Sequence, residues 1–107
     1  MTASTHHELE ATPVLDIGGE VGALVVQLDT VPQTGELEAC PRAHPDLRFH
    51  TGVHWREIAG KRVAVAVYPS IIQGDYEILD QALRAVAAVH IEGGEVAHIR
   101  LTLRGCG

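Results

Sequence analysis

Short apolar runs separated by glycine or proline are the feature of this sequence that most restricts its fold. Val21–Leu28 is a continuous apolar run, and residues 62–68 place β-branched side chains at alternate positions. Runs of this length suit buried strands better than helices, which usually need about ten or more residues. The turn residues recur about every ten positions, a spacing typical of β-sandwiches and barrels. We therefore expect an all-β fold of seven or eight strands.

The other predicted strands follow the same rule. They cover residues 14–17, 36–40, 48–56, 76–79, 85–91 and 96–103. Gly93 and Gly94 separate the last two, which we expect to pair as a hairpin with a glycine bulge that sets Val89 opposite Ala97. A helix stays an alternative for residues 79–91, because apolar residues within this segment also recur at helical spacing.

The length of the chain, 107 residues, is that of one domain. Its apolar content of 46% is typical of a globular protein that builds a core without disulfides. Residues 1–12 are mostly polar and lack periodicity, so we expect a flexible N-terminal tail before a single domain over residues 13–107. The net charge of −6 argues against a nucleic-acid partner, because phosphate binding requires a clustered basic surface.

Cysteine use and hydropathy indicate a cytoplasmic protein. Cys40 and Cys106 are too few for a disulfide scaffold, so we expect two free thiols in a reducing compartment. The sequence does not open with a basic segment followed by an apolar run, as signal peptides do. No apolar stretch approaches the roughly 20 residues that span a bilayer. We therefore expect no membrane association.

The C-terminal half contains the segment VAVYPSIIQGDYEI, residues 65–78. It resembles the strand–turn–strand signature of carboxypeptidase-regulatory-like and Cna-B-type domains, in which a leucine-proline-glycine-type turn precedes a Gly-x-Tyr strand. Gln73 stands here in place of the usual proline, and Tyr76 matches the tyrosine. Residues 89–96 resemble the closing hairpin of the same domains. The resemblance implies an antiparallel β-sandwich of seven or eight strands, of prealbumin or immunoglobulin-like type.

The whole chain also resembles a group of small actinobacterial proteins, some of which are labelled phospholipases. Residues 14–19, 50–54 and 68–76 carry this resemblance. The label implies a hydrolase, but the sequence contains no Gly-x-Ser-x-Gly elbow and no His-Asp arrangement with an obvious nucleophile. We therefore assign no catalytic residue and expect that the protein is not an enzyme.

The seven histidines are the main chemical signal of the sequence, because imidazole is a good ligand for Cu and Zn. His50 and His54 have the spacing that chelates one ion on a helix. The surrounding sequence favours a strand, in which residues four apart lie about 13 Å from each other, unless Gly52 introduces a bulge. A Cu or Zn site with His50, His54 and His44, to which Cys40 could add a ligand, is therefore one hypothesis.

The leading functional hypothesis is a non-catalytic binding or accessory module. β-Sandwiches carry function on their loops, and this chain lacks a catalytic set. Its partner would be a protein or a second copy of the chain. The single tryptophan, Trp55, is expected in the core. The alternative is a histidine-based metal-binding protein, for which His90 and His98 on the predicted hairpin offer a second pair.

Overall fold

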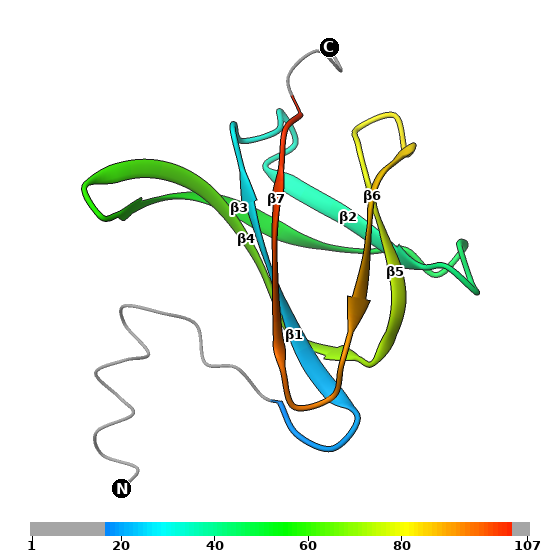
Figure 1. The fold of residues 1–107 in the computed structure, drawn as a ribbon. Helices are drawn as coiled ribbons and strands as arrows, with labels where there is room; N and C mark the ends of the chain where they lie inside the picture. Colours follow the sequence, from blue (N-terminus) through cyan, green and yellow to red (C-terminus); the bar gives the residue numbers. More distant parts are fainter. Residues whose placement is uncertain (1–16, 104–107) are drawn as a thin grey trace, which may run out of the picture.

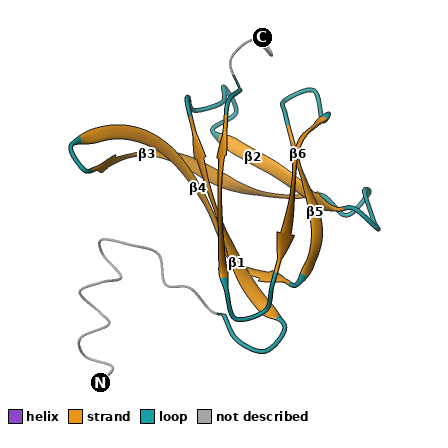
Figure 2. Ribbon diagram, viewed as in Figure 1, coloured by secondary structure: helices purple, strands orange, loops and turns teal. Residues whose placement is uncertain are grey.

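The structure is a computed structural model that describes residues 17–103, and all of its regular elements are strands (Figure 2). The predicted tail, residues 1–12, lies outside the described residues, as do the predicted strand over residues 14–16 and Cys106. The described part contains no helix with the length and apolarity needed to cross a membrane. The strands are β1 (Val21–Leu28), β2 (Glu36–Pro41), β3 (Phe49–Ile58), β4 (Lys61–Ile72), β5 (Gly74–Leu79), β6 (Ala85–Ile91) and β7 (Val96–Leu101).

The seven strands form one sheet in the order β6-β5-β2-β3-β4-β1-β7. The sheet curls on itself, so that its two edge strands, β6 and β7, lie near each other and an almost closed barrel results (Figure 1). All neighbours are antiparallel except β1 and β7, which are parallel. The prediction of an all-β fold is therefore confirmed, and the prediction of a purely antiparallel sheet is wrong.

The strand over Ala85–Ile91 is confirmed, but the predicted hairpin between β6 and β7 does not form. β6 pairs with β5, and β7 pairs with β1. The reason lies at the turn, where the Gly94 N–H donates to the Val21 carbonyl and the Ala23 N–H donates to the Glu95 carbonyl. Because the start of β1 takes these turn hydrogen bonds, β7 continues alongside β1 and separates from β6.

The hairpin of β3 and β4 extends beyond the barrel as an arm (Figure 1). The first residues of β3 pair with β2, but residues 53–58 pair with β4 alone. Ala59 and Gly60 close the arm with positive φ angles of 53° and 78°. We call residues 53–66 the β3–β4 arm. Because it extends past the packed interior, its outer part exposes side chains that a sequence pattern would assign to the core.

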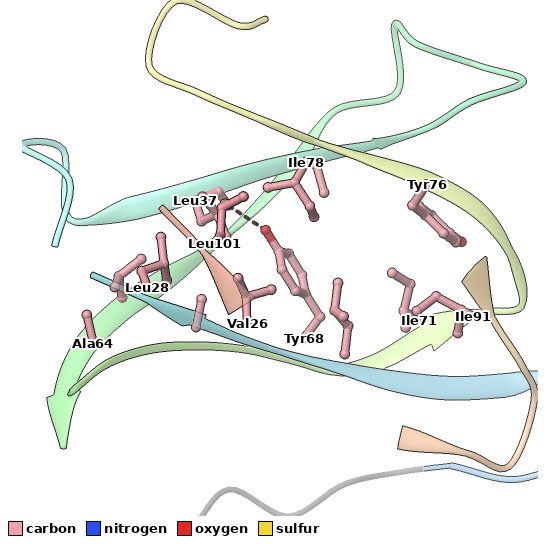
Figure 3. Packing of buried hydrophobic residues seen from close by; sticks show 14 residues of the cluster. Val26, Leu28, Leu37, Ala64, Tyr68, Ile71, Tyr76, Ile78, Ile91 and Leu101 are labelled. Atoms are coloured by element: carbon pink, nitrogen blue, oxygen red, sulfur yellow. Dashed lines mark hydrogen bonds between the residues drawn. The ribbon is translucent and has the colours of Figure 1, made fainter. Parts of the chain in front are cut away.

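The core fills the inside of the curled sheet around Tyr68 (Figure 3). The Tyr68 hydroxyl donates a hydrogen bond of 2.7 Å to the Leu37 carbonyl, which links β4 to β2 across the interior. Phe49 meets Tyr68 and Tyr76 edge to face, with ring centroids 5.5 and 5.9 Å away. The largest fully buried side chains are those of Leu24, Leu37, Ile78, Ile91, Val26 and Cys40.

Candidate functional site

Valine side chains cover the outer surface of the half-sheet formed by β3, β4, β1 and β7. Val67 is paired with Val25, and Val25 is paired in turn with His98. Residues directly opposite in a sheet point to the same side, so these three side chains share one face. Val65 and Val63 follow on that face of β4, at alternate positions. We call the surface formed by Val25, Val63, Val65 and Val67 the valine face.

The valine face is surrounded by basic and imidazole side chains. His54 is paired with Val65, and Arg56 with Val63. Gln27 lies between Val65 and Arg100 in the same row. Lys61 begins β4 on the same side, as alternation from Val63 requires. Within residues 53–58, 61–67, 24–28 and 96–101, no acidic residue takes an outward position, although the chain carries a net charge of −6.

Two hollows open along the valine face. The first has a volume of about 210 Å³ and is lined by His54, Val65 and Val67, with Pro69 at one end. The second has a volume of about 360 Å³. It is lined by Lys61, Val63 and Arg100 together with Asp29, which directly follows β1. One hollow thus combines valine and proline side chains with His54 and Arg56, and the other has more cationic than anionic groups in its wall.

The β3–β4 arm adds two large apolar side chains that face solvent. Trp55 is 44% exposed and Ile58 is 50% exposed. The guanidinium of Arg62 lies 4.9 Å from the Trp55 ring centroid, a cation–π contact across the arm. The expectation that Trp55 belongs to the core is therefore wrong, because the arm carries this residue past the edge of the barrel.

The histidines of the metal hypothesis occupy three different positions along β3 and the loop before it. His44 is exposed in the β2–β3 loop, where its N–H donates to the Pro41 carbonyl. His50 Nε2 lies 3.5 Å from the Glu36 carboxylate. His54 lies on the valine face. In the described part of the chain, no group of three histidine, cysteine or acidic residues could hold a metal ion.

Gly52 determines how His54 lies. β3 is extended here, and Gly52 pairs with Glu36 without a bulge. An added Cβ at Gly52 would come 2.9 Å from His54 Nε2, so the imidazole occupies the space that a side chain at residue 52 would fill. His54 is therefore folded back along β3 toward His50, and the two side chains share the outer face with Glu36.

His90, on β6, is held between two carboxylates, one on β5 and one directly after the end of β6. Its Nδ1 lies 2.7 Å from Asp75 Oδ1, and its Nε2 lies 2.8 Å from Glu92 Oε2. The hydrogen bond to Asp75, followed by that to Glu92, raises the pKa of His90, because both favour the charged imidazolium. A ring that donates from both nitrogens has no free lone pair for a metal. The predicted partnership of His90 with His98 depended on the hairpin that does not form.

Other ionisable groups in the interior have structural roles. The Asp80 side chain is buried, and its Oδ1 accepts hydrogen bonds of 2.9 Å from the N–H groups of Ala82 and Arg84. These bonds lower the pKa of Asp80, with the Arg84 N–H as the largest cause. Burial, followed by the nearby Glu77, raises the pKa of the Cys40 thiol, which keeps it protonated and unreactive.

Sequence reasoning missed the valine face because it assigned residues 21–28 and 62–68 to buried strands. A signal was present: in residues 63–67 valine alternates with alanine, so both sides of the strand are apolar. The small alanines lie in the core, and the larger valines point to the other side of the sheet, where Val63 and Val67 are half-buried and Val65 is buried. The cationic residues at positions 56, 61 and 100 lie far apart in the sequence, and only the sheet order brings them together.

Comparison with known proteins supports the fold alone. No family model matches the sequence, and no curated protein matches it. A crystal structure of a leucine-rich repeat protein from Bacteroides thetaiotaomicron is similar to this chain, with a TM-score of 0.52 and 9% sequence identity. The similarity covers 81% of this chain but only 12% of that one. At this identity the match indicates a shared arrangement of strands and carries no functional information.

Proposed function

We propose that this chain is a non-catalytic binding module that docks a protein partner on the valine face. The observation that carries the proposal is a row of valines on the outside of a sheet whose inside already forms the core. Apolar side chains gathered on one outer surface are typical of interaction sites. Covering a half-buried valine contributes on the order of 1 kcal/mol to association.

The β3–β4 arm supports the same proposal. Tryptophan and arginine are enriched where protein interfaces concentrate their binding energy, and the arm presents Trp55 with Arg62 stacked on it. Ile58 adds apolar area near the tip. Ile58 lies on the same side of the sheet as the valine face, whereas Trp55 and Arg62 lie on the opposite side. A partner on the valine face that also wraps around the arm would bury these groups together.

The finer fold assignment belongs to the same proposal. We infer a relationship to the prealbumin-like sandwiches, and the support comes from the turn between β4 and β5. The Tyr76 hydroxyl donates a hydrogen bond of 2.6 Å to the Ile72 carbonyl, four residues upstream. A tyrosine that closes a turn onto its own backbone is a recurring device of β-sandwiches. Gly74, with φ of 147°, provides the backbone conformation that the turn requires.

Selection from a random peptide library tests the binding function. Sequences enriched on the wild-type protein are expected to bind a Val25→Ser/Val67→Ser variant at least about tenfold more weakly, because two apolar contacts are lost. Ile72→Ser is the matched control, since Ile72 is 56% exposed and lies outside the valine face. Peptides that bind all three proteins equally, or a selection that enriches nothing, would contradict the proposal.

Metal binding is the second candidate function, with His50 and His54 as ligands. The observation in its favour is the position of His54, which folds over Gly52 toward the side of β3 that also carries His50 and Glu36. As placed in the described chain these groups do not form a metal site, so side-chain rotations would be needed to bring them onto one ion. Glu36 would then replace His44 as the third ligand.

Titration of tag-free protein with Cu and Zn tests this candidate. A site predicts about one ion per chain, lost in His50→Ala and in His54→Ala and weakened at acid pH, because ligand imidazoles must be neutral. His98→Ala, on β7, is the control and is expected to bind as wild type does. Binding that survives both substitutions on β3, or is absent from the wild type, would remove metal binding from consideration.

A further inference from the structure

The charge distribution identifies the kind of partner that the valine face fits. Resting on the proposed function, we infer that the docked partner is an acidic, extended segment of another protein. Its apolar side chains would enter the hollow beside His54, and its carboxylates would meet Lys61 and Arg100 in the neighbouring hollow.

The first argument is charge complementarity. Lys61, Arg100 and Arg56 place three cations around the valine face, whereas the chain as a whole has a net charge of −6. The outward positions of β3, β4, β1 and β7 carry no acidic residue. Asp29 lies at the border of the face, and Glu36 on β2 lies opposite Gly52 on the same outer side. Interfaces match opposite charges, so an acidic partner is attracted here and repelled by the rest of the surface.

The second argument is the spacing of the hollows. Val65 and Val67 line the first and Val63 lines the second, so the two hollows follow each other along β4. An extended chain covers the two to four residues between these valines, about 7 to 13 Å, with the same number of its own residues. A segment with an apolar and an acidic residue an even number of positions apart points both side chains to the same side, and can therefore direct the apolar side chain into one hollow and the carboxylate into the other.

The valines also distinguish a protein segment from a nucleic acid. Phosphate binding needs cations but gains nothing from a valine row, and single-stranded bases stack on aromatic rings rather than on valine. Trp55 lies between His54 and Arg56 in the sequence but on the opposite side of β3 from them.

Three peptides with the same leucine positions test the inference, with glutamate, glutamine or lysine an even number of positions from a leucine, so that both side chains point to the same side of an extended chain. Binding is measured from valine-methyl NMR shifts of the full chain. The glutamate peptide is expected to bind about tenfold more tightly than the lysine peptide at low salt. The difference should shrink as ionic strength rises from about 0.01 to 0.15 M and the Debye length falls from about 30 to 8 Å.

A charge reversal locates the effect. Lys61→Glu/Arg100→Glu is expected to reverse the preference, so that the lysine peptide binds more tightly. Arg42→Glu/Arg48→Glu is the matched control, because it changes the net charge equally at two exposed residues that pair with Glu77 and Glu38. This control should keep the preference for glutamate.

Several results would overturn the inference. Equal binding of the three peptides at the valine face would reject an acidic partner but would agree with the proposed binding function. Failure of all three peptides, or tighter binding of a single-stranded oligonucleotide, would also reject it. So would concentration-dependent dimerisation that Lys61→Glu/Arg100→Glu abolishes, because the face would then belong to a second copy. The proposed binding function itself is contradicted only by the outcomes of the library selection described above.

Discussion

Individual residues show how much of this fold depends on contacts that no local pattern encodes. Tyr68 lies in the strand that the sequence predicts most clearly, and its burial follows from that strand. Its hydroxyl partner, the Leu37 carbonyl, is 31 residues away and is brought close only by the curl of the sheet. Burial raises the pKa of Tyr68, so its hydroxyl is a neutral donor at neutral pH.

Removing this hydroxyl should destabilise the protein measurably. Tyr68→Phe is expected to lower the free energy of unfolding by about 1–3 kcal/mol, because the Leu37 carbonyl loses a buried donor. Urea denaturation measures the change. Tyr76→Phe is the control and should cost less, since its hydrogen bond is only partly buried. If Tyr68→Phe lowers the free energy of unfolding no more than Tyr76→Phe does, the interior hydrogen bond contributes little to stability.

Also at the residue scale, the sequence shows that histidine is unusually frequent, but it does not show which histidine side chain bonds to other residues. His90 attracted attention only through the predicted hairpin, yet it is the histidine with two carboxylate partners. Asp75 is its cross-strand neighbour, and this pairing depends on β5 lying next to β6. A spacing rule for metal ligands could not reveal an interaction between residues 15 positions apart.

Among the elements, β6 depends most on side-chain contacts at its end. It is an edge strand that pairs with β5 alone, and the Asp75–His90–Glu92 group fastens it there. The carboxylates favour the charged imidazolium, so the pKa of His90 is higher in the folded protein than the 6.5 of a free side chain. This stabilisation is fully present below pH 6.5 and is lost as the pH rises through the folded pKa.

His90→Gln should therefore destabilise the protein in a pH-dependent way. The difference in unfolding free energy between wild type and variant is expected to be greatest near pH 6 and to shrink toward about pH 9, where the imidazole is neutral in both states. Thermal unfolding at a series of pH values measures it. His98→Gln is the matched control on β7. A difference that grows with rising pH would show that the carboxylates do not stabilise the imidazolium.

The strands themselves could be predicted, whereas their neighbours could not. The strand over Ala85–Ile91 follows from its β-branched and apolar residues, and the glycine pair after it correctly marks a turn. A two-glycine turn can close a hairpin, but it can equally well join two strands that do not pair with each other. Hydrogen bonds from the start of β1 decide between these outcomes, and β1 lies some 70 residues earlier in the chain.

For the whole molecule, the sequence predicts the fold class and the strands that form the core, but it does not predict the valine face. Alternation and turn spacing predict an all-β fold of seven or eight strands, and the described residues form a sheet of seven. The curl, the parallel pair and the β3–β4 arm arise from long-range pairing, which a one-dimensional pattern does not contain. The valine face follows from those three features together, because it needs β3, β4, β1 and β7 side by side in one curved sheet.

The parallel pairing of β1 with β7 also has a consequence for synthesis on the ribosome. β1 is the first described strand to emerge and β7 the last. At about 5 to 20 residues per second, the roughly 75 residues between their starts take about 4 to 15 s to translate. Throughout that interval Leu24, Val26 and Leu28 lack the strand that will flank them. The newborn chain thus carries an exposed apolar edge for several seconds, which is where a cellular chaperone would first be needed.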